Sequence, residues 1–281
     1  MRALSNLISL FMVRIKFSWP TGKEGAFTTS WDDGEVHDRR LIEILNQYGI
    51  KGTWNLNSGR LFQEHRGDEY RLHTNEIQKL FQNHEVACHT LTHPFLDKEP
   101  EEIVLHEILE DRRRLEELMG YPIKGMALPF GAYDQRTLRL IKKCGIVYSR
   151  TTNSHFSFKL PSSFLEWHPT CHPKVNLIET WKRFLNDDSP DKLFSLWGHS
   201  HEFARDDDWN KIESFCEKVS QTTKLWYATN IEIYEYINAW RNLWCSINGQ
   251  YFRNIFAVDL WMWIDEELIC LRGGDTLRLK A

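Results

Sequence analysis

Short apolar runs alternate with segments of helical periodicity through most of the chain. Each run is short enough for a buried strand and is followed by a polar turn and a longer amphipathic segment. Repeated strand–helix alternation predicts a parallel sheet or barrel. Seven strands are expected, at Gly25–Trp31, Gly52–Asn57, Glu85–His89, Lys124–Pro129, Ile146–Arg150, Leu193–His199 and Leu225–Thr229.

The segments between these runs have helical spacing and recognisable helix ends. Leu41, Ile42 and Leu45 share one side of the first of them. Gly120 and Gly145 follow two others, as a glycine after a helix C-terminus commonly does. The helices are expected at Asp38–Gln47, Thr74–Phe81, Pro100–Met119, Asp134–Cys144, Val175–Leu185, Asp207–Gln221 and Ile231–Leu243.

The pattern changes after residue 243, where short β segments are separated by turns such as Asn248-Gly249. We therefore expect three parts: an N-terminal segment at residues 1–21, an α/β barrel at 22–243 and a small β extension at 244–281. Seven strands is one short of an eight-fold barrel, and 281 residues suit a barrel with loops.

Composition narrows the function classes. The chain is 42% hydrophobic and 26% charged, with a net charge of -4, so neither a nucleic-acid nor an anionic-membrane partner is expected. The six cysteines are scattered without a C-x-x-C pair, which favours reduced thiols over a zinc ribbon or disulfide scaffold. The twelve tryptophans fit stacking on sugars and burial in a core equally well.

The N-terminal apolar run Leu7–Val13 ends at Arg14 and is too short to span a membrane. No small-residue cleavage site follows it clearly, so a cytoplasmic location is expected, with an extracytoplasmic one left open. The oligomeric state is not predicted.

Polar groups collect at the predicted carboxyl ends of four strands, where α/β barrels carry their active sites. Asp32 and Asp33 end the first strand, and "HTLTH", His89 to His93, ends the third. "ALPFGAY" ends the fourth and "WGHSHEF", containing His199 and Glu202, ends the sixth. These side chains are expected to converge.

Two imidazoles and one carboxylate form a common divalent-metal site. Asp33, His89 and His93 would then be the ligands, leaving Asp32 as a general base beside the cation. Each signal has an ordinary explanation, since Asp-Asp-Gly is often only a turn and a lone His199 is more often a core histidine. Their joint occurrence at strand ends favours a site.

With these segments in view, the sequence resembles the polysaccharide deacetylase superfamily (NodB-like, carbohydrate esterase family 4). "TSWDDG" matches its first motif, T-F-D-D-G, and "HTLTH" matches its second, H-[ST]-x-x-H. Pro129, Phe130 and Gly131 match part of the third, R-x-P-[YF]-G. Leu193–His199 is similar to the last, an apolar strand ending in His. The resemblance covers roughly residues 22 to 240.

The resemblance implies a distorted barrel of seven β/α units and a metal-dependent deacetylase of N-acetyl or O-acetyl groups on a polysaccharide or oligosaccharide. It assigns Asp32 as base, Asp33, His89 and His93 as metal ligands and His199 as acid. The backbone N–H of Phe130 would help to hold the oxyanion. Zn²⁺ is the expected ion, with Co²⁺, Ni²⁺ or Mn²⁺ as alternatives.

The departures from the family motifs leave alternatives open. Ala127 stands where the third motif has the Arg that orients the base, and Arg150 could replace it. The Asp-Trp pair of the fourth motif has no clear match, although Trp167 lies in the right region. Candidate oxyanion or substrate residues, besides Phe130, are Arg150, Trp167 and Glu202. A hydrolase of non-sugar amides or cyclic imides, or a non-catalytic carbohydrate-binding protein, are the competing hypotheses.

Overall fold

The computed structural model describes residues 15–63 and 70–279. The apolar run Leu7–Val13 lies outside them. A parallel seven-stranded sheet forms the body of the molecule, with strand order β6-β5-β4-β3-β2-β7 and β8 paired with β2. All seven predicted strands are therefore present, as β2 (Gly25–Asp32), β3 (Thr53–Leu56), β4 (Glu85–Cys88), β5 (Gly125–Ala127), β6 (Tyr148–Arg150), β7 (Leu193–Gly198) and β8 (Leu225–Tyr227).

Strand β2 is the centre of this sheet. All eight of its residues are buried, which explains why its sequence, GAFTTSWD, does not alternate. It pairs with β8 at its start, with β3 at its end and with β7 along most of its length. Asp32, its last residue, is thereby fixed in the middle of the carboxyl edge.

The ladder ends at β6 and β7, and an irregular segment lies between these two strands. The Trp167 N–H donates to Ser149 O at 3.0 Å, and the Thr170 N–H donates to Ser195 O at 2.8 Å. Residues 167–171 thus bridge the gap without forming a regular strand. The result is the distorted (β/α)7 barrel that the strand count and the family resemblance predict.

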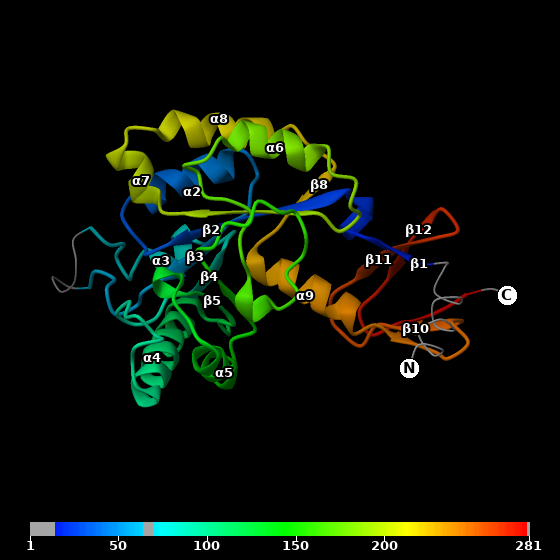
Figure 1. The fold of residues 1–281 in the computed structure, drawn as a ribbon, viewed down its shortest axis with the longest axis horizontal. Helices are drawn as coiled ribbons and strands as arrows, with labels where there is room; N and C mark the ends of the chain where they lie inside the picture. The colour runs from blue at the N-terminus through cyan, green and yellow to red at the C-terminus, as the bar shows by residue number, and fades with distance from the viewer. Residues whose placement is uncertain (1–14, 64–69, 280–281) are drawn as a thin grey trace.

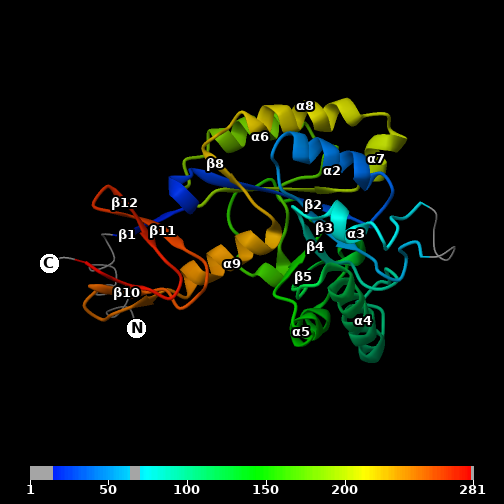
Figure 2. The ribbon, with the colours of Figure 1, turned by 180° about the vertical axis from the view of Figure 1, so that it is seen from behind.

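Helices cover both sides of the curled sheet. In Figure 1, α2, α6, α7 and α8 lie above it, α4 and α5 lie below it, and α9 separates it from the C-terminal strands; Figure 2 shows the same layers from behind. The predicted helices are all present, but α3 begins only at Ile77, and α7 was not predicted. Their bounds are α2 (Asp38–Gln47), α3 (Ile77–Leu80), α4 (Glu101–Met119), α5 (Gln135–Lys143), α6 (Leu177–Leu185), α7 (Ser200–Arg205), α8 (Trp209–Ser220) and α9 (Asn230–Arg241).

Local signals set the helix ends. Asp134 caps α5 by accepting from the Thr137 N–H at 2.6 Å, and Thr229 forms a capping box with Glu232 at the start of α9. Gly120, after α4, has a φ of 76°, a conformation that glycine adopts without steric cost.

Two small antiparallel sheets form the extension. One contains β1 (Ile15–Ser18), β11 (Leu260–Ile264) and β12 (Glu267–Leu271), and the other contains β9 (Trp244–Cys245), β10 (Tyr251–Arg253) and β13 (Thr276–Arg278). Strand β1 pairs with β11, so residues from the predicted N-terminal segment belong to the C-terminal sheet.

Most tryptophans whose role the sequence left open are core residues. Trp19, Trp31, Trp54, Trp167 and Trp181 are at most 2% exposed, whereas Trp244 is 59% exposed. All six cysteines are unpaired. Among the described residues, no helix has the length and apolar character needed to cross a membrane.

Candidate active site and metal centre

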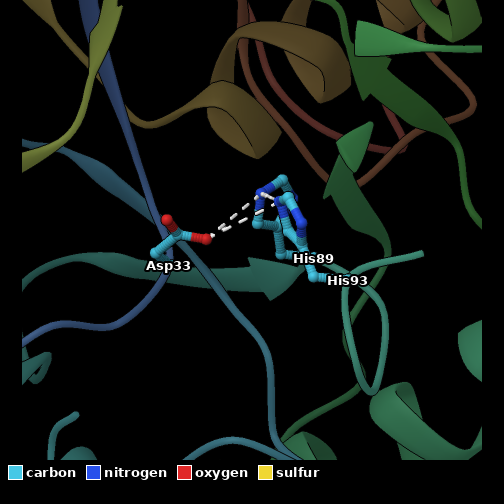
Figure 3. A group of neighbouring side chains, drawn as sticks. All are labelled: Asp33, His89 and His93. Atoms are coloured by element: carbon cyan, nitrogen blue, oxygen red, sulfur yellow. Dashed lines mark hydrogen bonds and ion pairs between the residues drawn. The ribbon is translucent and has the colours of Figure 1, made fainter. Parts of the chain in front are cut away.

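The predicted ligand residues converge at the carboxyl edge of the sheet. Asp33 Oδ1 lies 3.7 Å from both His89 Nε2 and His93 Nε2, and the two imidazole nitrogens lie 3.1 Å apart. Figure 3 shows both rings facing the same carboxylate oxygen. That oxygen is buried and has no hydrogen-bond partner, which is costly unless a cation neutralises it.

The protonation states also fit a cation. His89 Nδ1 lies 2.9 Å from Ala127 O and must donate to it, so Nε2 carries the free lone pair that faces Asp33. Burial and the neighbouring His89 lower the pKa of His93 to about 4, so its imidazole is neutral at physiological pH. Neutral imidazoles and a carboxylate suit Zn²⁺ and similar first-row ions, so these residues fit the metal that the fold family implies.

The backbone at this site adopts conformations that side chains other than glycine rarely take. Asp33, Thr90 and His93 have φ values of 85°, 66° and 69°. Residues held in this way cluster at functional sites, where surrounding contacts stabilise them. The Arg71 guanidinium donates to the Asp33 carbonyl at 2.6 Å, and Asn57 Nδ2 donates to the Thr90 carbonyl at 2.9 Å.

Helix α4 clamps the loop that carries both histidines. Its Asp111 carboxylate accepts from the backbone N–H of Ser58 at 2.7 Å and of His89 at 3.0 Å. One turn earlier, Glu107 accepts from the N–H of Thr92 at 2.8 Å. Sequence reasoning missed both carboxylates, although two acids on the buried face of a helix are a usable signal.

Asp32 is 2% exposed and is held as an anion. Both of its carboxylate oxygens contact Arg150 Nη2, and Asn55 Nδ2 donates to Oδ1 at 2.8 Å. Burial raises the pKa of Asp32, but Arg150, His89 and His199 outweigh it and lower the pKa below its ordinary value. Asn55 was not predicted; a buried amide inside a strand was its only signal.

Arg150 reaches Asp32 from the strand next to Ala127, the position where the third family motif has its arginine. The two residues are register partners on β6 and β5, so Arg150 starts one strand further along the same edge. Its side chain is fully buried, with Nε donating to Ser30 Oγ at 3.1 Å and the guanidinium 4.8 Å from the Trp197 ring. This planar support fixes how the guanidinium meets Asp32.

His199 follows β7 and faces Asp32 from the opposite side, with 4.0 Å between His199 Nε2 and Asp32 Oδ2. Its Nδ1 lies 3.6 Å from Glu202 Oε2. Glu202 is also bound by His172 Nε2 and Lys174 Nζ, each at 2.8 Å. Burial lowers the pKa of His199, but Glu202 and Asp32 outweigh it and raise the pKa above the ordinary value.

Phe130 and Trp167, two further predicted site residues, differ in their exposure to solvent. Phe130 is at the site, 51% exposed, in a tight turn at Pro129–Gly131 with a φ of 58°. Trp167 is 1% exposed and packs against Tyr148 and Phe164, so it is a core residue and does not present a surface to a substrate. Its position on the segment that bridges β6 and β7 explains the burial.

Part of the chain is similar to a known protein family. Residues 20–149 match the polysaccharide deacetylase family. Over these residues the chain is similar to the polysaccharide deacetylase superfamily. The matched residues include Asp32, Asp33, His89, His93 and Phe130; Arg150 and His199 lie beyond them. No curated protein has a sequence that matches the chain.

Two solved structures share the fold of this chain, and a third matches a part of it. A Mycobacterium smegmatis protein with an inferred assignment as a polysaccharide deacetylase is 19% identical, with a TM-score of 0.61 over 80% of this chain and 93% of that one. The Xyl-CE4 domain of a multidomain xylanase from the hindgut metagenome of Trinervitermes trinervoides is 16% identical, with a TM-score of 0.53 over 81% and 100%. The Streptococcus pyogenes deacetylase PplD is 22% identical, with a TM-score of 0.42 over 44% of this chain and 55% of that one.

Proposed function

We propose that this protein is a metal-dependent hydrolase that removes acetyl groups from an acetylated polysaccharide or oligosaccharide. One observation carries the proposal: Asp33, His89 and His93 present three ligand atoms to one point, beside a second aspartate that Arg150 keeps ionised. A non-catalytic carbohydrate-binding protein would not require these three metal-ligand residues. The contact between Arg150 and Asp32 also weighs against the cyclic-imide alternative, which rested on the missing arginine at position 127.

The residues divide the chemistry between them. Asp32 is ionised and accepts the proton of the attacking water as general base. The backbone N–H of Phe130 would stabilise the negative charge that develops on the acetyl oxygen. A divalent cation at Asp33, His89 and His93 would supply Lewis acidity towards the acetyl carbonyl, and Zn²⁺ is the ion we propose.

The leaving group needs a proton, because an amine anion is too basic to depart. His199 is placed to give it: its Nε2 faces Asp32, and Glu202 lies beside its other nitrogen. The raised pKa of His199 favours the protonated form that a general acid requires. Removal of an N-acetyl group as acetate and a free amine is therefore the reaction that best fits, with O-acetyl hydrolysis as the less demanding alternative.

Paired variants test this assignment. Asp33→Asn and His93→Ala are expected to lose stoichiometric Zn²⁺ in elemental analysis, because the first removes the anionic charge of one ligand and the second removes a ligand altogether. Asp32→Asn and His199→Ala are expected to keep the metal and to release acetate from N-acetylated glucosamine oligomers about 10²–10⁴-fold more slowly. Full metal content in Asp33→Asn, or undiminished acetate release in Asp32→Asn, would contradict the assignment.

A further inference from the structure

Two phenylalanine rings from different loops stack at the mouth of the site. Phe95 follows the histidine loop and Phe130 lies in the turn after β5. Their ring centroids are 3.8 Å apart and their planes differ by 9°. They remain 38% and 51% exposed, so this is a specific ring pair at the surface and not part of the buried core.

The pair is one link in a row of contacts that ends at a metal ligand. The His93 ring meets Phe130 edge-on, with 4.5 Å between centroids and 73° between planes. The Lys98 ammonium lies 4.2 Å from the centre of the Phe95 ring. Phe130 is therefore in contact with both His93, a proposed metal ligand, and Phe95. A displacement of the Phe130 ring would disturb both contacts.

The turn at Phe130 needs such support. Its φ of 58° is a left-handed conformation that non-glycine residues adopt at a steric cost. The turn's own hydrogen bonds, from the N–H of Gly131 to Leu128 O and from the N–H of Ala132 to Pro129 O, do not act on the ring. The stack with Phe95 does.

The backbone that follows Phe95 is anchored to the rest of the molecule. The next residue, Leu96, is fully buried. Arg136 Nη2, from α5, donates to the carbonyls of Leu96 at 3.4 Å and Asp97 at 3.2 Å. Phe95 thus projects from an anchored loop and can hold its partner in place.

We propose that Phe95 is a positioning residue for the reaction proposed above. Its ring fixes the Phe130 turn, and so the amide that faces the oxyanion, and it braces the His93 ring through Phe130. The inference rests on the proposed function for its catalytic meaning, but the mechanical link between Phe95 and the turn is independent of it.

Three substitutions at one position separate stacking from simple bulk. Phe95→Ala removes the ring, Phe95→Leu keeps apolar volume without a plane, and Phe95→Tyr keeps the plane. Phe95→Ala and Phe95→Leu are expected to lower kcat for acetate release about 10- to 100-fold, since a small misplacement of an oxyanion donor is costly. KM is expected to stay within about threefold, and Phe95→Tyr to stay near wild type.

The control is Tyr251→Ala, which removes a ring of 39% exposure that also has a cation, Arg278, 5.7 Å from its centre. It lies in the C-terminal sheet and is expected to leave kcat unchanged. Wild-type kcat in Phe95→Leu would show that bulk suffices and would overturn the proposal. A raised KM with unchanged kcat would instead make Phe95 a substrate contact and would also overturn it.

Hydrogen exchange gives a readout that does not depend on activity. Peptides covering residues 128–133 are expected to exchange faster in Phe95→Ala and Phe95→Leu than in Phe95→Tyr, with Zn²⁺ content equal in all three. If the wild type releases no acetate from any probe, the proposed function fails while faster exchange still supports the mechanical link. Unchanged exchange in Phe95→Ala overturns the link whatever the activity.

Discussion

At the scale of single residues, the site depends on an arginine that reaches Asp32 from β6. Arg150 stands in register with Ala127, so the guanidinium comes from the strand next to the family position. The two positions share the same edge and both are fully buried. A guanidinium from either strand is therefore able to approach Asp32.

A swap tests this equivalence. Arg150→Ala is expected to lower acetate release at least about 100-fold with metal retained, because it leaves Asp32 buried without its counter-ion, a change that also costs stability. Arg150→Ala combined with Ala127→Arg is expected to recover part of the rate, since the space that Arg150 vacates admits the new side chain. Acetate release, metal content and urea unfolding of the single and double variants are the measurements. A double variant no more active than Arg150→Ala would show that the two strands are not equivalent.

The site residues that could be predicted from the sequence are those that lie in local motifs. The ligands and Asp32 lie within short motifs at strand ends, so they could be predicted. Asn55, His172 and Lys174 reach the site from positions with no motif of their own, and only the tertiary fold brings them there. The assignment of Trp167 to the substrate was wrong because the irregular bridge between β6 and β7 has no periodicity from which burial could be predicted.

At the scale of elements, the opposite end of the barrel holds a buried carboxylate that fixes α9. Glu85, at the start of β4, accepts from the Ile231 N–H at the helix N-terminus and from Thr53 Oγ1, both at 2.8 Å, and from the Tyr148 hydroxyl at 2.6 Å. It is 6% exposed, and burial raises its pKa to about 7. Strand, helix and sheet floor are joined through this one group.

The raised pKa predicts a pH-dependent stability. An ordinary Glu in the unfolded chain loses its proton near pH 4.5, whereas folded Glu85 keeps it to about pH 7. The folded state then binds more protons, so Glu85's contribution falls as pH rises from about 4.5 through about 7. Glu85→Gln keeps the shape of the side chain without its charge. The free energy of unfolding of this variant, relative to that of wild type, is therefore expected to rise by up to about 3 kcal/mol between pH 5 and pH 8. Urea unfolding at both pH values measures it.

The matched control for this titration is Glu24→Gln, a half-exposed carboxylate paired with Lys224 at 2.6 Å. Exposed ion pairs contribute less than about 1 kcal/mol, so this variant is expected to differ little from wild type at either pH. A Glu85→Gln variant whose difference from wild type does not change with pH would mean that the carboxylate is already ionised at pH 5.

At the scale of the whole molecule, the extension is part of the barrel's stability. Tyr236, on α9, contacts Ser18 O of β1 through its hydroxyl, which also accepts from the Trp261 N–H of β11 at 3.1 Å. Its ring stacks on Trp19 at 5.8 Å. One hydrophobic cluster includes barrel residues such as Leu193 and extension residues such as Leu260. The sequence predicted the extension but not that β1 completes it, because pairing between the two chain ends has no local signal.

A shared core predicts shared unfolding. Tyr236→Phe leaves the buried Ser18 carbonyl and the partly buried Trp261 N–H of the β1–β11 pair without their hydroxyl partner, at a cost of about 1–3 kcal/mol. With about 2–4 °C per kcal/mol for a chain near this size, Tm is expected to fall by about 2–12 °C. Scanning calorimetry should show a single transition in wild type and in Tyr236→Phe, at a lower temperature in the variant. The control, Tyr251→Phe at the exposed face of β10, is expected to leave Tm unchanged. Two separate transitions, only one of them moved by Tyr236→Phe, would mean that barrel and extension unfold independently.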